Sequence, residues 1–148
     1  MKRLLPLLLA LSLSVVQAHA HLSAATPADG EVLTTAPEQV ALKFSEPVET
    51  MFSIFKVYRL DAEVDLDSDN ADQRLNGLAA ALMNEVLELR EDGPDRVDTG
   101  TQSDSATTAE LSVILDSELP AGHYVAMWRV LSIDTHSTEG FIVFTVLD

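Results

Sequence analysis

Residues 124–146 read "YVAMWRVLSIDTHSTEGFIVFTV", and this stretch decides the fold that the sequence predicts. In its first part every second residue is apolar or aromatic, and a period of two places such residues on one face of a β-strand. These residues are Tyr124, Ala126, Trp128 and Val130. The last part, residues 141–146, has the length and the β-branched and aromatic composition of a second strand. We therefore predict two strands, separated by the polar segment 133–140.

Several earlier segments show the same strand pattern. They are "VALKF" (40–44), "SIFKVYRL" (53–60) and "LSVIL" (111–115). Between them lie "TPADG", "TAPEQ", "SEPVE" and "LPAG", which contain the Pro, Asp and Gly residues that are typical of turns. Short strands at this spacing predict an all-β fold, namely an antiparallel β-sandwich or a small Greek-key barrel.

One region, about residues 61–110, interrupts this pattern. It holds 14 of the 24 acidic residues, and residues 71–90 place apolar side chains at helical spacing. We expect an amphipathic helix there, with Asp72 near its start. Residues 91–108 have the composition of a flexible connection. We interpret the region as an acidic helical insertion between two strands.

The first twenty residues are typical of a secretory signal peptide. Lys2 and Arg3 precede an apolar run, and "AHA" at 18–20 fits a cleavage site. The run is shorter than the roughly 20 residues that span a bilayer. We expect residues 1–20 to be removed and residues 21–148 to form one exported domain.

Charge and cysteine content exclude several functions. Without Lys2 and Arg3, the 9 basic residues fall to 7 against 24 acids, a net charge of −17. Nucleic acid is then an implausible partner, because phosphate binding needs clustered Lys and Arg. The chain has no cysteine, which excludes zinc–thiolate and blue-copper sites.

The candidate metal ligands are an Asp-x-His pair and a histidine at the chain start. If cleavage follows Ala20, His21 offers its α-amine and its imidazole. Asp134 and His136 project to the same side if their backbone is extended. Three nitrogens and one oxygen suit Cu(II). Cleavage after Ala18 would instead give "HAH" at the terminus, which can wrap Cu(II) locally without Asp134.

Three segments resemble the CopC family of periplasmic copper-resistance proteins. They are "HLSAATPADGEVL", "APEQVALKFSEPVE" and "LPAGHYVAMWRVLSIDTHSTEGFIVFTV". The resemblance implies a cupredoxin- or immunoglobulin-like Greek-key sandwich that binds one Cu(II) for copper resistance or homeostasis. It implies His21, Asp134 and His136 as ligands, with Glu46 in contact with the ligands rather than the ion. It also implies a periplasmic location and an inner-membrane partner resembling CopD.

Two features depart from that family. Some members have a methionine-rich Cu(I) loop, whereas this chain has only Met51, Met83 and Met127 after residue 20. We expect Met83 and Met127 to be packing residues. The acidic insertion is the second departure.

His123 follows the turn segment "LPAG", and we expect it to be an exposed turn residue.

Two other functions compete with copper carriage. Lytic polysaccharide monooxygenases also use a terminal histidine and a second imidazole, but Asp134 would occupy a position that those enzymes keep for oxygen. We therefore expect no enzyme. The second competitor is a metal-free exported module that binds partners through its acidic insertion.

Overall fold

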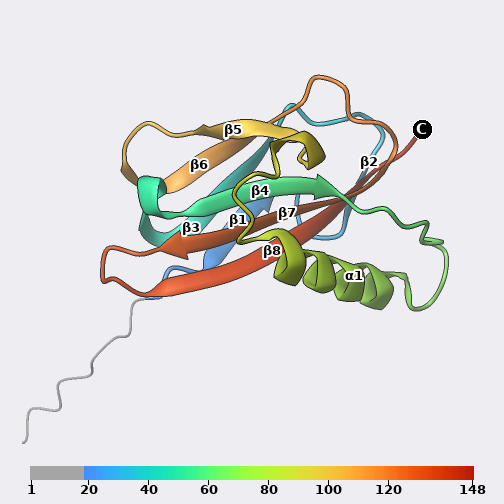
Figure 1. Ribbon diagram of the computed structural model, residues 1–148. Helices are drawn as coiled ribbons and strands as arrows, with labels where there is room; N and C mark the ends of the chain where they lie inside the picture. The colour runs from blue at the N-terminus through green and yellow to red at the C-terminus, as the bar shows by residue number, and fades with distance from the viewer. Residues whose placement is uncertain (1–18) are drawn as a thin grey trace, which may run out of the picture.

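The computed structural model describes residues 19–148 as two four-stranded β-sheets packed face to face (Figure 1). Sheet A has the order β1 (Leu22–Thr26), β3 (Gln39–Glu49), β6 (Thr107–Leu115), β5 (Asp98–Gln102). Sheet B has the order β2 (Glu31–Leu33), β8 (Ser137–Val146), β7 (Gly122–Leu131), β4 (Ile54–Arg59). All neighbours are antiparallel except β2 and β8. Within the described residues a single isolated β-bridge, Val48 to Ser132, joins the two sheets at one corner, so the fold is an open sandwich rather than a closed barrel.

The core between the sheets contains the residues that the alternation predicts. From β7 these are Tyr124, Ala126, Trp128 and Val130; from β3 and β6 they are Val40, Leu42, Phe44, Leu111, Val113 and Leu115. Each of these side chains is at most 5% exposed. The predicted β-sandwich is therefore confirmed, and its inner face follows directly from the period of two.

Helix α1 (Ala71–Val86) covers the outer face of sheet B (Figure 1). Its buried side chains, Leu75, Ala79, Met83 and Val86, form a second core with the alternate residues of β7 and β8, Val125, Met127 and Val143. Strand β7 is thus buried on both faces, which explains why its sequence is apolar almost throughout. The predicted helix and the packing roles of Met83 and Met127 are confirmed.

The segment after the helix is not the flexible connection that its composition indicated. It contains the short 3₁₀ helix η2 (Gly93–Asp95) and strand β5, which pairs with β6. Polar Asp, Thr and Gln residues fit this strand because β5 lies at the sheet edge with its side chains mostly exposed. Composition alone was misleading because an edge strand needs little apolar surface.

His123 also differs from its expected exposed position. It belongs to β7, is 7% exposed, and its Nδ1 lies 2.8 Å from Thr145 Oγ1 on β8. Its backbone carbonyl accepts a hydrogen bond from Leu60 N, which begins the chain segment that covers it. Burial lowers the pKa of His123 below its ordinary value. The expectation was wrong because the strand starts one residue earlier, at Gly122, and continues beneath the insertion.

A buried polar network fastens the insertion to sheet B. Lys56 on β4 donates to the carbonyls of Val86 (2.8 Å) and Leu89 (2.7 Å) and forms an ion pair with Asp92, and Tyr58 donates to the same carboxylate. Lys56 and Asp92 are each 4% exposed. Lys56 thereby binds the carbonyl of Val86, the last residue of α1, and that of Leu89, three residues beyond the helix. Carbonyls at the end of a helix lack partners within it.

The predicted signal peptide falls largely on residues 1–18, which lie outside the described residues. Within residues 19–148, no helix has both the length and the apolar character needed to cross a membrane.

Replacing Asp92 by Asn should lower the free energy of unfolding by about 3–5 kcal/mol, because Lys56 is left as a buried charge without its counter-ion. Urea denaturation measures this loss. Glu110→Gln is the matched control, since it breaks the exposed Lys43–Glu110 pair and should cost about 1 kcal/mol or less. Equal effects of the two substitutions would contradict a structural role for the network.

Tyr58 should make the free energy of unfolding fall as the pH rises in the alkaline range. Burial, together with the hydrogen bond to Asp92, raises the pKa of Tyr58 above its ordinary value of 10.0. The unfolded chain then loses this proton first, so the contribution is complete below about pH 10 and declines as the pH rises further. Tyr58→Phe should therefore lose stability less steeply than the original chain between about pH 10 and 11.5, as measured by urea unfolding. Identical slopes would contradict the assignment.

Candidate metal centre

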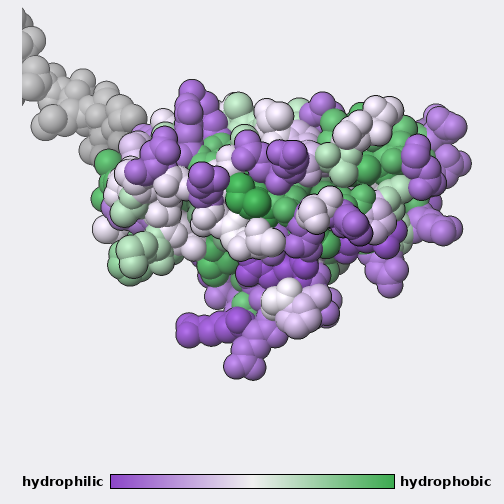
Figure 2. All heavy atoms as spheres, turned by 90° about the horizontal axis from the view of Figure 1, so that it is seen from above, coloured by the Kyte–Doolittle hydropathy of each residue, from purple (hydrophilic) through white to green (hydrophobic). Residues whose placement is uncertain are grey.

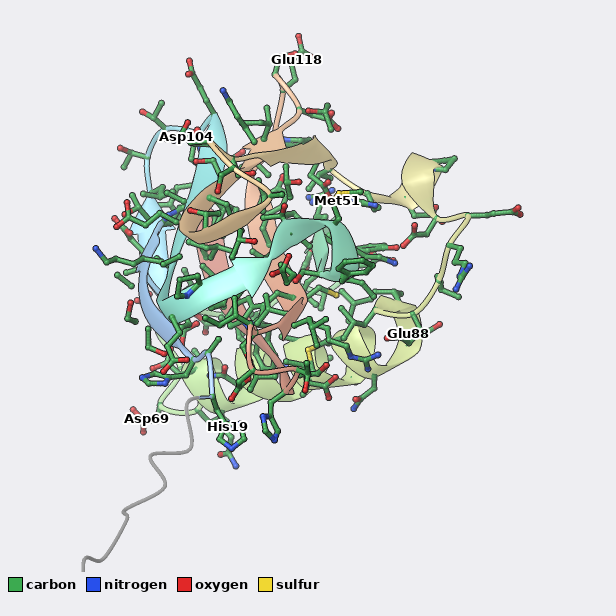
Figure 3. The ribbon with its side chains drawn as sticks, turned by 90° about the vertical axis from the view of Figure 1, so that its left-hand side faces the viewer. His19, Met51, Asp69, Glu88, Asp104 and Glu118 are labelled. Carbon is green, nitrogen blue, oxygen red and sulfur yellow. The ribbon has the colours of Figure 1, made fainter. Side chains whose placement is uncertain are left out.

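The start of the described chain and the loop between β7 and β8 lie at the same end of the sandwich, which Figure 3 faces. Ala20 is fully buried, and its carbonyl accepts a hydrogen bond from Thr138 Oγ1 at the start of β8. Strand β1, which follows, pairs with β3. These contacts fix residues 19–21 beside a loop that lies more than a hundred positions later in the sequence.

Asp134 and His136 lie in a tight turn and not in an extended backbone, so the condition on which they would project to the same side is not met. Residues 133 and 134 form the turn, Thr135 has a φ of 72°, and Thr135 N donates to Ser132 O. The turn nevertheless brings the predicted pair together: His136 Nδ1 lies 3.0 Å from Asp134 Oδ2. The backbone N–H of His136 also donates to Asp134 Oδ1 at 3.2 Å.

Ser132 organises this turn, and sequence reasoning gave it no role. It is 1% exposed, its hydroxyl contacts the Asp134 carboxylate, and the same oxygen lies 2.9 Å from the carbonyl of His136. The bridge to Val48 holds Ser132 against β3. The sequence does place a serine two residues before Asp134, which could have indicated a hydroxyl that supports the carboxylate. That this serine is buried depends on the bridge between the sheets.

His19 meets the Asp-x-His turn directly. Its ring contacts the ring of His136 edge-on, with centroids 4.8 Å apart. Because Nδ1 of His136 faces Asp134, its Nε2 is the nitrogen that can turn toward an ion. His19, Asp134 and His136 thus form one continuous group of contacts.

His21 lies toward sheet A instead. Its Nδ1 is 3.0 Å from Ser45 Oγ on β3, its backbone N–H donates to the same hydroxyl at 3.1 Å, and its carbonyl accepts from Ser45 N at 2.8 Å. Glu46, the next residue on β3, is partly buried. Across residues 19–148, no three His, Asp or Glu side chains are already gathered as a set that could hold a metal ion.

The electrostatics of the turn favour a cation. The hydrogen bond from Ser132, with further help from the His136 backbone N–H and ring, outweighs desolvation and lowers the pKa of Asp134 to about 2. Asp134 is therefore a carboxylate at neutral pH. A fixed negative charge beside the imidazole of His136, which in turn contacts that of His19, is an arrangement that attracts a divalent ion.

Comparison with known proteins places this fold and turn in context. The family model described as CopC domain matches residues 22–86 and 79–147. Copper transport protein CutJ of Bacillus subtilis (strain 168) is 30% identical over 130 residues, which cover 87% of this chain but 18% of CutJ. Protein YobA of Escherichia coli (strain K12) is 29% identical over 131 residues, or 88% of this chain and 81% of YobA.

A solved structure agrees with the architecture. PcoC, a copper resistance protein from Escherichia coli, superposes with a TM-score of 0.57 at 23% identity, covering 86% of this chain and 99% of PcoC. At this identity the likeness concerns the fold. The matched segments of the family model, in contrast, extend over nearly all of the described residues and include both the start of β1 and the Asp134–His136 turn. The chain belongs to the CopC domain family.

Proposed function

We propose that this chain binds one Cu(II) ion at the end of the sandwich that carries His19, Asp134 and His136, and that it serves copper resistance or homeostasis in the periplasm. The observation that carries the proposal is the contact of His19 with His136, whose other side is held by an ionised Asp134. Imidazole nitrogens with one carboxylate oxygen are a donor set that suits Cu(II).

The mature chain should begin at His19 rather than at His21. Ala20 is fully buried, belongs to the core between the sheets, and accepts the hydrogen bond from Thr138. Cleavage after Ala20 would remove this residue, whereas cleavage after Ala18 would keep it. The new α-amine would then belong to the histidine that contacts His136. His21, held by Ser45, would support the terminal segment, and Glu46 would act near it without binding the ion.

The site suits a carrier better than an oxidising enzyme. Trp128, Tyr58 and Tyr124, which are all of the chain's Trp and Tyr residues, are each at most 5% exposed, so none can form a row that binds a polysaccharide. Met83 and Met127 are buried, which leaves Met51, 82% exposed, as a single accessible thioether after residue 20. We therefore infer no catalysis and no separate Cu(I) site.

A membrane transport protein resembling CopD is the proposed partner. CutJ, named as a copper transport protein, is a much longer protein, of which this chain matches 18%. A match to part of a protein named for copper transport supports a role for this domain in handing copper to a transport protein.

The starting residue should decide copper affinity. We expect a chain that begins at His19 to bind Cu(II) at least about tenfold more tightly than one that begins at His21 or one that carries a glycine before His19, because only the first has an α-amine next to His136. Competition with a chromophoric chelator measures the affinities, and the intact mass of the exported protein gives the natural start.

Three results would revise or overturn this site. If the chain that begins at His21 binds Cu(II) as tightly as the chain that begins at His19, His21 is the terminal ligand. Unchanged affinity of His136→Ala, in the chain that begins at His19, would show a local site formed by residues 19–21 alone. Absence of stoichiometric copper in all forms would favour a metal-free interaction module.

Ser132→Ala should weaken Cu(II) binding by about 10–100-fold, because the hydroxyl that orients Asp134 and the turn is lost. Ser103→Ala is the matched control, since its hydroxyl bonds only the nearby Ser105 carbonyl in an exposed loop. Chelator competition gives both affinities, and circular dichroism verifies that each variant is folded. Unchanged affinity of Ser132→Ala would mean that Asp134 needs no such support.

A further inference from the structure

Three large apolar side chains project into solvent at the end of the sandwich that holds the candidate metal centre. Met51 is 82% exposed, Phe52 is 72% exposed and Ile133 is 57% exposed. Met51 and Phe52 lie on η1 (Thr50–Phe52), and Ile133 lies in the loop that contains Asp134 and His136. We call these three residues the end patch; Figure 3 faces this end and labels Met51 and His19 at separate places on it.

The two segments that carry the end patch lie side by side because both are tied to the end of β7. Val48, two residues before η1, bridges to Ser132, which precedes Ile133. After η1, Ser53 Oγ accepts a hydrogen bond from Leu131 N at 3.1 Å. The two segments are therefore neighbours, although 80 positions separate them in the sequence.

Hydrogen bonds also hold η1 so that Phe52 stays outside the core. Thr50 N donates to Ala106 O at 2.9 Å, Ser53 N donates to Thr50 O at 3.3 Å, and Ser53 Oγ donates to Glu49 O at 2.7 Å. An aromatic side chain that a fixed turn presents to water is typical of the anchor residue of a protein interface.

Charge selects the kind of partner. Glu49 and Asp134 lie within two residues of the end patch in sequence, and Arg129 on neighbouring β7 is already paired with Glu88 and Glu139. Residues 19–148 hold 7 basic and 24 acidic side chains, and hydrophilic side chains dominate the outline in Figure 2. A second copy of the chain and an anionic lipid surface would both be repelled, whereas a cationic surface would be attracted.

We propose that the end patch is the docking surface for a copper-accepting protein whose contact face combines apolar side chains with Lys or Arg. This inference rests on the proposed copper binding and adds the route by which the ion leaves. Because Ile133 adjoins Asp134 and His136, the docked partner would cover the metal centre, and the ion would pass between ligands without entering bulk solvent.

Photo-crosslinking in the cells that make the protein tests the surface. A photoreactive phenylalanine analogue is placed at position 52 or 133, and at Val32 as the matched control. Val32 is 48% exposed but pairs with Thr145, at the opposite end of β8. We expect positions 52 and 133, but not 32, to join the same protein through a segment that contains apolar residues and Lys or Arg. Glu49→Lys should lower this yield at least about threefold.

Purified components then connect docking with transfer. Phe52→Ser should leave Cu(II) affinity within about twofold of the original chain and slow copper transfer to the crosslinked protein at least about tenfold. Adducts only with a second copy of this chain, adducts only with lipid, or equal adducts from position 32 would overturn the proposal, as would unimpaired transfer by Phe52→Ser. If the chain binds no copper but positions 52 and 133 still crosslink one cationic protein, the copper function fails while the docking surface stands.

Discussion

The joining of the two sheets at the corner where β3, β7 and β8 meet is the constraint on which the rest depends. The Val48–Ser132 bridge joins the two sheets there, and the Thr138 hydroxyl holds the buried carbonyl of Ala20 against β8. Without these two contacts, nothing would hold His19 beside His136. The same bridge buries Ser132, which orients Asp134. A metal centre, its supporting hydroxyl and the neighbouring end patch therefore share one structural origin.

The second organising feature is that sheet B is covered on both faces. Strand β7 contributes Tyr124, Ala126, Trp128 and Val130 to the core between the sheets, while Val125 and Met127 pack against α1. The acidic insertion is consequently part of the folded domain. Its packing is fastened by Lys56 and Asp92, a buried pair that the surrounding carbonyls and Tyr58 fully satisfy. A rigid β7 in turn gives the Asp134–His136 turn a fixed base.

Much of the fold could be predicted from the sequence because burial follows the side-chain period. Alternation in β3, β6 and β7 identified the inner face, and the spacing of Leu75, Ala79, Met83 and Val86 identified the helix and its packed side. Strand β5 was missed because an edge strand with polar side chains has no apolar period. His123 was placed on the surface because nothing in its local sequence shows that residues 60–66 fold over it.

The sequence by itself determined the sandwich, the helix, the acidic charge and the chemical types gathered near the metal centre, because periodicity, composition and short motifs are local properties. Only the tertiary structure decided that His19 contacts His136 while His21 turns to Ser45, that Ser132 supports Asp134, and that the segment of Met51 and Phe52 lies beside that of Ile133. These relations join residues that are distant in the chain. They depend on strand pairing and on the bridge between sheets, which no local pattern specifies.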